Sequence, residues 1–448
     1  MNIISKYKSD FRQNTKISLP IIAGQLGQVA VYIVDNIMVG KLGASSLAAV
    51  SLGTALYAIV MVIGFGLSFG LPPLISEADG SNRPDNVSRF FKHSLIINII
   101  IGIVFTGVLW IGIPYLDFLG QNPEVANLAK GYLYFTALSS LPFMLFLTLR
   151  SFSDALSDTV PAMTAMIIGN ICNIILNYLF IYGKFGMPAY GVAGAALASL
   201  IARIIMLVVL FGIIYYKKQL WNYIAACNFK KYQWTNFKKV LDLGVPSALQ
   251  MFFEISAFSG AALIMGMVGK NEQAAHQVAI NISSITFMIC TGIAMASTIR
   301  VGNQLGQNNM VGVRNAGISA IIQVSIVMAI CSLIFFVFHS TLALIYINDP
   351  LVVSIASTLL IYAAIFQIPD GVQVTALAAL RGIKDVKTPT VITLISYYVF
   401  GLPISYYTAI ILKIGAPGVW LGLLIGLFIS ATLLTYRFSK LTKVVSNI

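Results

Sequence analysis

The chain has 448 residues, of which 58% are hydrophobic and only 10% are charged, and its mean hydropathy is +0.87. These values exclude a soluble globular protein and indicate an integral membrane protein. The formal net charge is +13. A nucleic-acid partner is not needed to explain this charge, because most basic residues fall on one predicted side of the membrane.

Twelve apolar segments are long enough to cross about 30 Å of hydrocarbon as helices. They are expected at residues 17–39, 47–74, 94–114, 129–149, 161–181, 190–215, 241–268, 274–299, 316–336, 354–379, 391–411 and 416–437. Residues 1–16 are polar and the first apolar run is too long for a cleavable signal peptide. We therefore predict an all-α integral membrane protein of the bacterial cytoplasmic (inner) membrane, with both termini in the cytoplasm.

The basic residues support this orientation. Of the 28 Lys and Arg residues, those predicted on the outer side are Lys41, Lys130, Lys184, Lys270 and Lys413. Nearly all the others fall on the inner side, as the positive-inside rule requires. Arg203 is the exception, because it interrupts the sixth apolar segment, where it either extends toward the inner surface or pairs with an acid.

The second half of the chain repeats landmarks of the first after a shift of roughly 230 residues. The tetrapeptide MVGK occurs at 38–41 and again at 267–270, and LP at 19–20 corresponds to VP at 245–246. We therefore predict two six-helix lobes related by a pseudo-two-fold axis along the membrane normal. The predicted boundaries are an N-lobe at residues 1–215, a cytoplasmic linker at 216–240 and a C-lobe at 241–448.

A duplicated architecture of this kind favours transport by alternating access. A rigid scaffold, such as a channel or a membrane-embedded enzyme, is the alternative. No metalloprotease motif, P-loop or nucleophile elbow occurs in the sequence, so we expect a transporter and not an enzyme.

Three acidic residues lie well inside apolar segments: Asp35, Glu254 and Asp370. A charged carboxylate at the bilayer centre costs on the order of 3 kcal/mol, and such residues usually mark ion or proton pathways. The alternative is a purely structural acid that is protonated or satisfied by neighbouring amides. The two halves do not share these acids at equivalent positions, which favours a separate chemical role in each lobe.

Polar residues accompany the acid in the first half. Asn170, Asn173 and Asn177 fall on one face of the fifth predicted helix, and Ser199 on the sixth adds a hydroxyl. Together with Asp35 they form a set of hard oxygen ligands suited to Na+, and equally an environment for a protonated carboxylate. Hydrogen bonding between helices is the alternative reason for the asparagines.

A similar stripe of Gln277, Asn281 and Ser284 lies on the eighth predicted helix, where it can enclose a second site with Glu254 and Asp370. Three runs of small residues are predicted to serve close helix packing and not ligand contact. These runs are GFGLSFG at 64–70, GVAGAALAS at 191–199 and LGLLIG at 421–426.

Several longer segments, in this order along the chain, resemble the multidrug and toxic compound extrusion (MATE) transporters, in particular their NorM-like branch. These segments are VDNIMVGKLG at 34–43, LAAVSLG at 47–53, LRSFSDALSDT at 149–159, AAHQVAINISS at 274–284 and IPDGVQVTALAALRGIKD at 368–385. The resemblance implies two six-helix lobes and export of small organic cations in exchange for Na+ or H+. Within the same superfamily, a lipid-linked oligosaccharide flippase is an alternative, as is a Na+-dependent uptake carrier.

The resemblance also implies particular site residues. In the N-lobe, the family's cation site corresponds to Asp35, Asn173 and Asn177, with Ser199 where a hydroxyl residue is usual. In the C-lobe, the family's acids and polar stripe correspond to Glu254, Asp370, Gln277 and Asn281. Phe366 stands where some relatives have tyrosine, and Pro20 is available for a bend in the first helix. We expect transient Na+ at Asp35, Asn173, Asn177, Glu254 and Asp370, no cofactor, and a monomer in contact with lipid.

Overall fold

The structure is a computed structural model that describes residues 7–120 and 122–443, all of which lie in helices or in the loops between them. Within these residues, twelve helical stretches are long and apolar enough to span a membrane, which confirms the predicted all-α architecture. Both chain termini, predicted to be cytoplasmic, lie outside the described residues.

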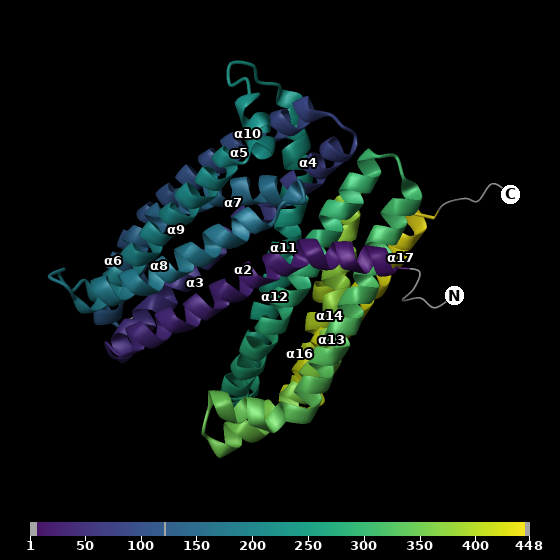
Figure 1. Cartoon of the computed structure of the whole chain (residues 1–448). Coiled ribbons are helices and arrows are strands. Elements are labelled where there is room, and N and C mark those ends of the chain that lie inside the picture. Colours follow the sequence, from purple (N-terminus) through teal and green to yellow (C-terminus); the bar gives the residue numbers. More distant parts are fainter. Residues whose placement is uncertain (1–6, 121, 444–448) are drawn as a thin grey trace. The chain divides into compact units, whose positions relative to one another are not determined.

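Figure 1 shows the helices coloured along the chain. The first half contains α2 (Lys8–Gly40), α3 (Ala44–Ser68), α4 (Leu71–Gly80), α5 (Pro84–Gly112), η1 (Ile113–Leu119), α6 (Pro123–Leu138), α7 (Ser140–Ala155), α8 (Val160–Tyr182), α9 (Gly191–Tyr216) and α10 (Lys218–Ala225). The second half contains α11 (Trp234–Val268), α12 (Lys270–Gly306), α13 (Met310–Tyr346), α14 (Pro350–Gly382), α15 (Lys387–Leu394), η2 (Ile395–Gly401), α16 (Leu402–Tyr406), η3 (Tyr407–Ile411) and α17 (Ala416–Leu441).

Most helices extend beyond the apolar segments that predicted them. Helix α2 begins at Lys8 and not at residue 17, and α12 continues to Gly306. Backbone hydrogen bonding continues into polar turns outside the hydrocarbon, which hydropathy does not detect. For the same reason the predicted linker contains α10 and the first turns of α11.

The eleventh span departs from a regular helix. Its segments η2 and η3 are π-helical, and the N–H of Leu402 bonds to the carbonyl of Tyr397, five residues back. Pro403 follows at once and supplies no N–H to the carbonyl of Val399. The preceding turns widen to the longer hydrogen-bond pattern, which often occurs at functional sites.

The described residues form two compact units. The first unit extends from Ala23 to Ala248, and the second combines the residues up to Ile22 with those from Leu249 onward. Helices α2 and α11 therefore each pass from one unit to the other, shortly after Pro20 and Pro246. These packing units are a different division from the predicted lobes at 1–215 and 241–448, whose boundaries stay a prediction.

The start of α2 is fixed to the second unit by a buried polar cluster. The Arg300 guanidinium on α12 donates to Asp10 Oδ1 and to Asn14 Oδ1, each at 2.6 Å. Asn14 in turn donates to Ser319 Oγ on α13 at 3.2 Å. A buried charge held by a carboxylate and amide oxygens fixes both partners, because losing either leaves the other uncompensated.

The start of α11 is fixed to the first unit by close packing. A Cβ atom at Gly66 would lie 2.2 Å from the Cα of Ala248, and one at Gly70 would lie 2.7 Å from the carbonyl oxygen of Val240. Only glycine permits this approach of α3 and the residues after it to α11. The contact confirms the packing role predicted for residues 64–70. A Cβ at Gly194 or Gly422 would likewise meet backbone within 2.5 Å, which supports the same role for the other two runs.

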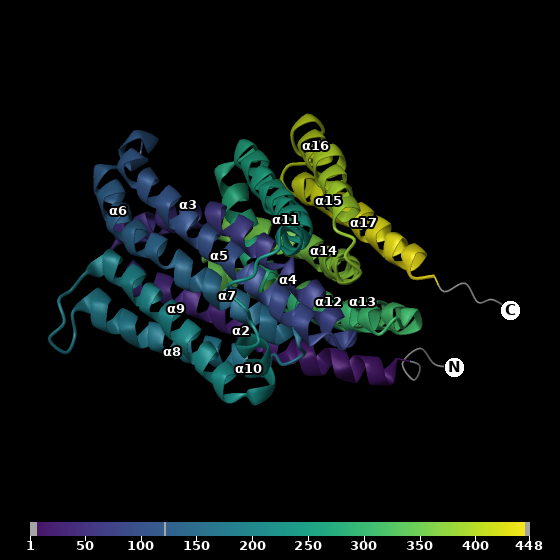
Figure 2. The same ribbon diagram turned by 90° about the horizontal axis from the view of Figure 1, so that it is seen from above.

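Each unit has an interior that positions polar side chains. In the first unit α8 and α9 lie side by side, as Figures 1 and 2 both show. In the second unit an apolar cluster joins α11, α12, α14, η2 and α17, with the large side chains of Tyr397 and Trp420 almost fully buried. Most of the polar residues described next lie on these helices.

Candidate functional site

Asp35 lies in the second half of α2, where this helix approaches α8 closely. A Cβ atom at Gly24 would lie 2.9 Å from Met166 Sδ, and one at Gly27 would lie 2.9 Å from Asn170 Nδ2. Further along, the Tyr182 hydroxyl donates to the carbonyl of Met38 at 2.7 Å. The two helices are therefore held together by glycine packing before Asp35 and by a hydrogen bond of the Tyr182 hydroxyl after it.

The structure brings four of the predicted N-lobe residues into one hydrogen-bonded chain, which we call the Asp35 cluster: Asp35, Asn173, Asn177 and Ser199. Nδ2 of Asn177 donates to Asp35 Oδ1 at 2.5 Å and to Asn173 Oδ1 at 3.1 Å. Nδ2 of Asn173 donates to Ser199 Oγ at 3.4 Å. The cluster thus combines carboxylate, amide and hydroxyl oxygens from α2, α8 and α9.

Two buried amide atoms on α8 have no hydrogen-bond partner in the described part of the chain. They are Oδ1 of Asn177 and Nδ2 of Asn170. Asn177 is fully buried, so its carbonyl oxygen loses water without gaining a protein donor. A cation bound next to Asp35 would satisfy this oxygen, and a hard ion such as Na+ prefers such a ligand set.

Arg203 lies one helical turn after Ser199 on α9. Its Nη1 donates to the hydroxyl of Tyr57 and to Ser139 Oγ, and its guanidinium packs over the rings of Tyr57 and Phe143 at 4.8 and 4.7 Å from their centroids. Among the described residues no carboxylate forms an ion pair with it. Hydroxyl groups and aromatic faces hold this charge.

The second unit has a different arrangement around Glu254, which we call the Glu254 cluster: Glu254, Gln250, Gln373, Arg381 and Tyr397. Gln250 and Gln373 donate to the two carboxylate oxygens of Glu254 at 3.0 and 3.3 Å. Arg381 donates to Gln250 Oε1 at 3.3 Å, and the Tyr397 hydroxyl donates to Gln373 Oε1 at 2.9 Å. All five side chains are buried.

The other predicted C-lobe residues are only partly joined to this cluster. Asp370 is buried on α14, one turn before Gln373, but its carboxylate makes no hydrogen bond within the described residues. On α12, Gln277 donates to Asn281 Oδ1 at 2.9 Å, and Ser284 Oγ bonds to the Asn281 carbonyl. No hydrogen bond between described residues links this pair to Glu254 or Asp370.

Phe366 packs in the apolar core instead of contributing a polar group. Its ring lies 5.6 Å from that of Trp420 and 6.0 Å from that of Phe258, in edge-to-face arrangements. No group of three or more His, Cys, Asp or Glu residues that could hold a metal occurs among the described residues.

Comparison with known proteins gives one consistent family. The sequence model of the MatE family matches residues 20–179 and 246–407. The probable multidrug resistance protein NorM of Rhizobium meliloti is 33% identical over 99% of this chain and 96% of its own. The multidrug resistance protein NorM of Photobacterium profundum is 32% identical over 96% and 95%. This chain belongs to the MatE family.

Solved structures show the MATE fold. The eukaryotic MATE transporter AtDTX14 superposes with a TM-score of 0.88 at 20% identity, covering 97% of this chain and 98% of that one. A MATE protein in the bent conformation superposes with a TM-score of 0.89 at 22% identity, covering 97% and 95%. The family resemblance predicted from the sequence is confirmed, and with it a multi-pass membrane transporter and not an enzyme.

The structure adds residues to the second site that sequence reasoning missed. Hydropathy places Arg381 among the inner-side basic residues, although the side chain reaches Gln250 inside the unit. Gln250 precedes Glu254 by four residues and Gln373 follows Asp370 by three, so each glutamine lies on the same helix face as the neighbouring acid. Helical spacing was thus an available signal for the two glutamines. The contact of Tyr397 depends on the π-helical segment, which the sequence pattern does not indicate.

Proposed function

We propose that this MATE protein is a secondary antiporter that exports cationic, amphipathic drugs or toxic organic compounds in exchange for Na+ or H+, by alternating access. Its relatives named above are described as multidrug resistance proteins. The single observation that carries the proposal is Asp35, a carboxylate within an apolar helix. It accepts a hydrogen bond from the Asn177 amide, whose carbonyl oxygen is unsatisfied.

The coupling follows from competition for negative charge. An ion bound at Asp35 removes the charge that attracts a cationic substrate, and the substrate does the same to the ion. Each ligand therefore lowers the affinity for the other by the same factor. Na+ uses the oxygens of Asn173, Asn177 and Ser199, whereas H+ needs only the carboxylate; the same cluster supports both.

The Glu254 cluster supplies a second position for an ion or substrate. A membrane potential of roughly 150 mV contributes about 3.5 kcal/mol per translocated charge. Exchange of one Na+ for one monovalent cation moves no net charge, so the potential drives export of such a cation only when a second ion enters. Two acidic positions, Asp35 in one unit and Glu254 with Asp370 in the other, provide for two ions.

Helices α2 and α11 are the proposed hinges. Pro20 supplies no N–H to the carbonyl of Lys16, and Pro246 supplies none to that of Asp242, so each helix lacks one internal bond near the point where it changes units. Solved MATE structures carry the descriptions bent and straight conformation. We propose that this protein works as a monomer with its termini and linker in the cytoplasm.

The test is transport of a fluorescent organic cation by the purified protein in vesicles, with Na+ and pH gradients imposed separately. We expect extrusion against the substrate gradient under at least one of them. Substrate movement in the same direction as the ion would identify an uptake carrier. Transport that responds to neither gradient, or only of phosphate-linked lipids, would overturn the antiport mechanism.

A further inference from the structure

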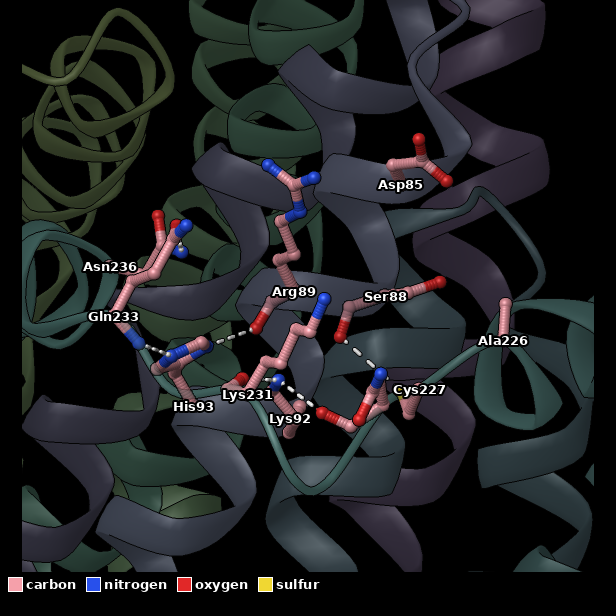
Figure 3. Close-up of a pocket in the computed structure, with 11 residues that line it drawn as sticks. Asp85, Ser88, Arg89, Lys92, His93, Ala226, Cys227, Lys231, Gln233 and Asn236 are labelled. Carbon is pink, nitrogen blue, oxygen red and sulfur yellow. Dashed lines mark hydrogen bonds between the residues drawn. The ribbon is translucent and has the colours of Figure 1, made fainter.

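A cavity of about 260 Å³ lies within the first unit, between the start of α5 and the segment at 226–236 that follows α10 (Figure 3). This segment and the end of α10 are both bonded to α5. Ser88 Oγ donates to the carbonyl of Tyr223 at 2.7 Å, Cys227 Sγ donates to that of Ser88 at 3.3 Å, and the N–H of Gln233 donates to His93 Nε2 at 3.2 Å. The cavity therefore has α5 on one side and the bonded segment on the other.

The floor of the cavity contains a buried cation without a counter-ion. Lys92 is 4% exposed, and its Nζ donates to the carbonyls of Asn228, at 2.7 Å, and Lys231. The ammonium also lies 5.0 Å from the centroid of the Tyr232 ring. Among the described residues no carboxylate pairs with it and its third N–H has no acceptor. Burying an ammonium without an opposite charge is costly, so an anion bound beside Lys92 would be stabilised.

The rim of the cavity adds two more cations. Arg89 and Lys231 are exposed side chains that line it, and in the described part of the chain neither guanidinium nor ammonium has a hydrogen-bond partner. Asp85 is the one carboxylate in the lining, and Figure 3 shows it at the far side from His93. Burial raises the pKa of the Cys227 thiol to about 11, against a smaller opposite effect of the Lys92 charge. The thiol is neutral at pH 7 and supplies no compensating charge.

We propose that this cavity binds a phosphate group, held by Lys92 at its floor and by Arg89 and Lys231 at its rim. Arginine presents a fork of donors that fits two phosphate oxygens, and the lysines add point charges. The linker lies on the side that the basic residues predict to be cytoplasmic, where anionic phospholipid headgroups and soluble phosphate compounds are both available. The shared chemistry is a phosphate that bridges α5 to the linker.

The experiment is isothermal titration calorimetry of the full chain in a neutral detergent. The titrants are inorganic phosphate, short-chain phosphatidylglycerol and short-chain phosphatidylcholine, the last as a headgroup without net charge. The test variant is Arg89→Gln with Lys231→Gln, which leaves the structural bonds of Lys92 intact. The control is Lys230→Gln, an exposed neighbour that does not line the cavity.

A preference for phosphatidylglycerol over both other titrants, weakened about tenfold in the double variant and unchanged in the control, supports a lipid headgroup as the ligand. Equal binding of inorganic phosphate with the same dependence on the variants supports a soluble phosphate compound. The proposal is overturned by binding of phosphatidylcholine as tight as phosphatidylglycerol, by equal effects of test and control variants, or by no detectable binding. Melting temperatures of all variants establish that each one is folded.

Discussion

The Asp35 and Glu254 clusters compensate a buried acid in different ways. Asp35 is reached by a single amide, and the asparagine that donates to it keeps an unsatisfied oxygen nearby. Glu254 is bonded on both carboxylate oxygens, and one of its partners is bonded to Arg381. The first cluster has spare ligand capacity for an ion, whereas the second is already balanced by protein groups. An ion or substrate at Glu254 must therefore displace existing bonds.

The largest expected effect comes from Asp35→Asn, which keeps the side-chain shape but removes the charge. Ion-driven efflux should fall about tenfold or more, because both ligands lose the charge for which they compete. The measurement is efflux of a fluorescent cation from vesicles under an imposed ion gradient. Asn36→Ala is the control, since the Asn36 side chain bonds to its own helix at the carbonyl of Tyr32. Wild-type efflux by Asp35→Asn would remove the first cluster from the mechanism.

The next effect tests whether the second cluster is balanced by Arg381. Arg381→Met removes the positive charge and leaves Gln250 Oε1 without this donor, so we expect a lower melting temperature. The loss should be smaller when Glu254→Gln is present, because the uncompensated carboxylate is then gone. A double-mutant cycle of melting temperatures in detergent measures this coupling. Strictly additive losses would show that Arg381 and Glu254 are energetically independent.

Sequence reasoning reached the first cluster more fully than the second. The sequence itself shows that Asn173 and Asn177 are spaced to lie on one helix face. It also shows an acid, Asp35, within another apolar segment. Arg381 follows an apolar stretch near the end of its span, where hydropathy places it at the membrane surface, although it bonds inward. The span count was likewise predictable, because a hydrocarbon layer of about 30 Å sets the length of a helix. The π-helical turns around Tyr397 were not, since they depend on local bonding near Pro403.

A smaller effect on stability is expected from removing the hydroxyl of Tyr397, which lies in the π-helical segment η2. Tyr397→Phe removes the hydroxyl that donates to Gln373 Oε1, and the buried amide oxygen is left unsatisfied. The expected destabilisation is about 1–3 kcal/mol. Tyr398→Phe is the matched control, because the Tyr398 hydroxyl bonds Ser256 at an exposed position outside the second cluster. Thermal unfolding should separate the two variants; equal melting temperatures would show that the Gln373 bond adds nothing to the second cluster.

The smallest effect is expected at the outer end of the first cluster. Ser199 Oγ accepts from Asn173 at 3.4 Å, a long hydrogen bond that contributes little by itself. Ser199→Ala should leave folding intact and lower Na+ affinity by only about threefold, since one of several oxygen ligands is lost. H+-driven efflux should not change, because a proton needs no hydroxyl ligand. Efflux measured against Na+ concentration and against pH, with Ser259→Ala as a control on an exposed helix face, therefore distinguishes the two ions. Equal losses under both gradients would mean that Ser199 positions Asn173 and does not bind the ion.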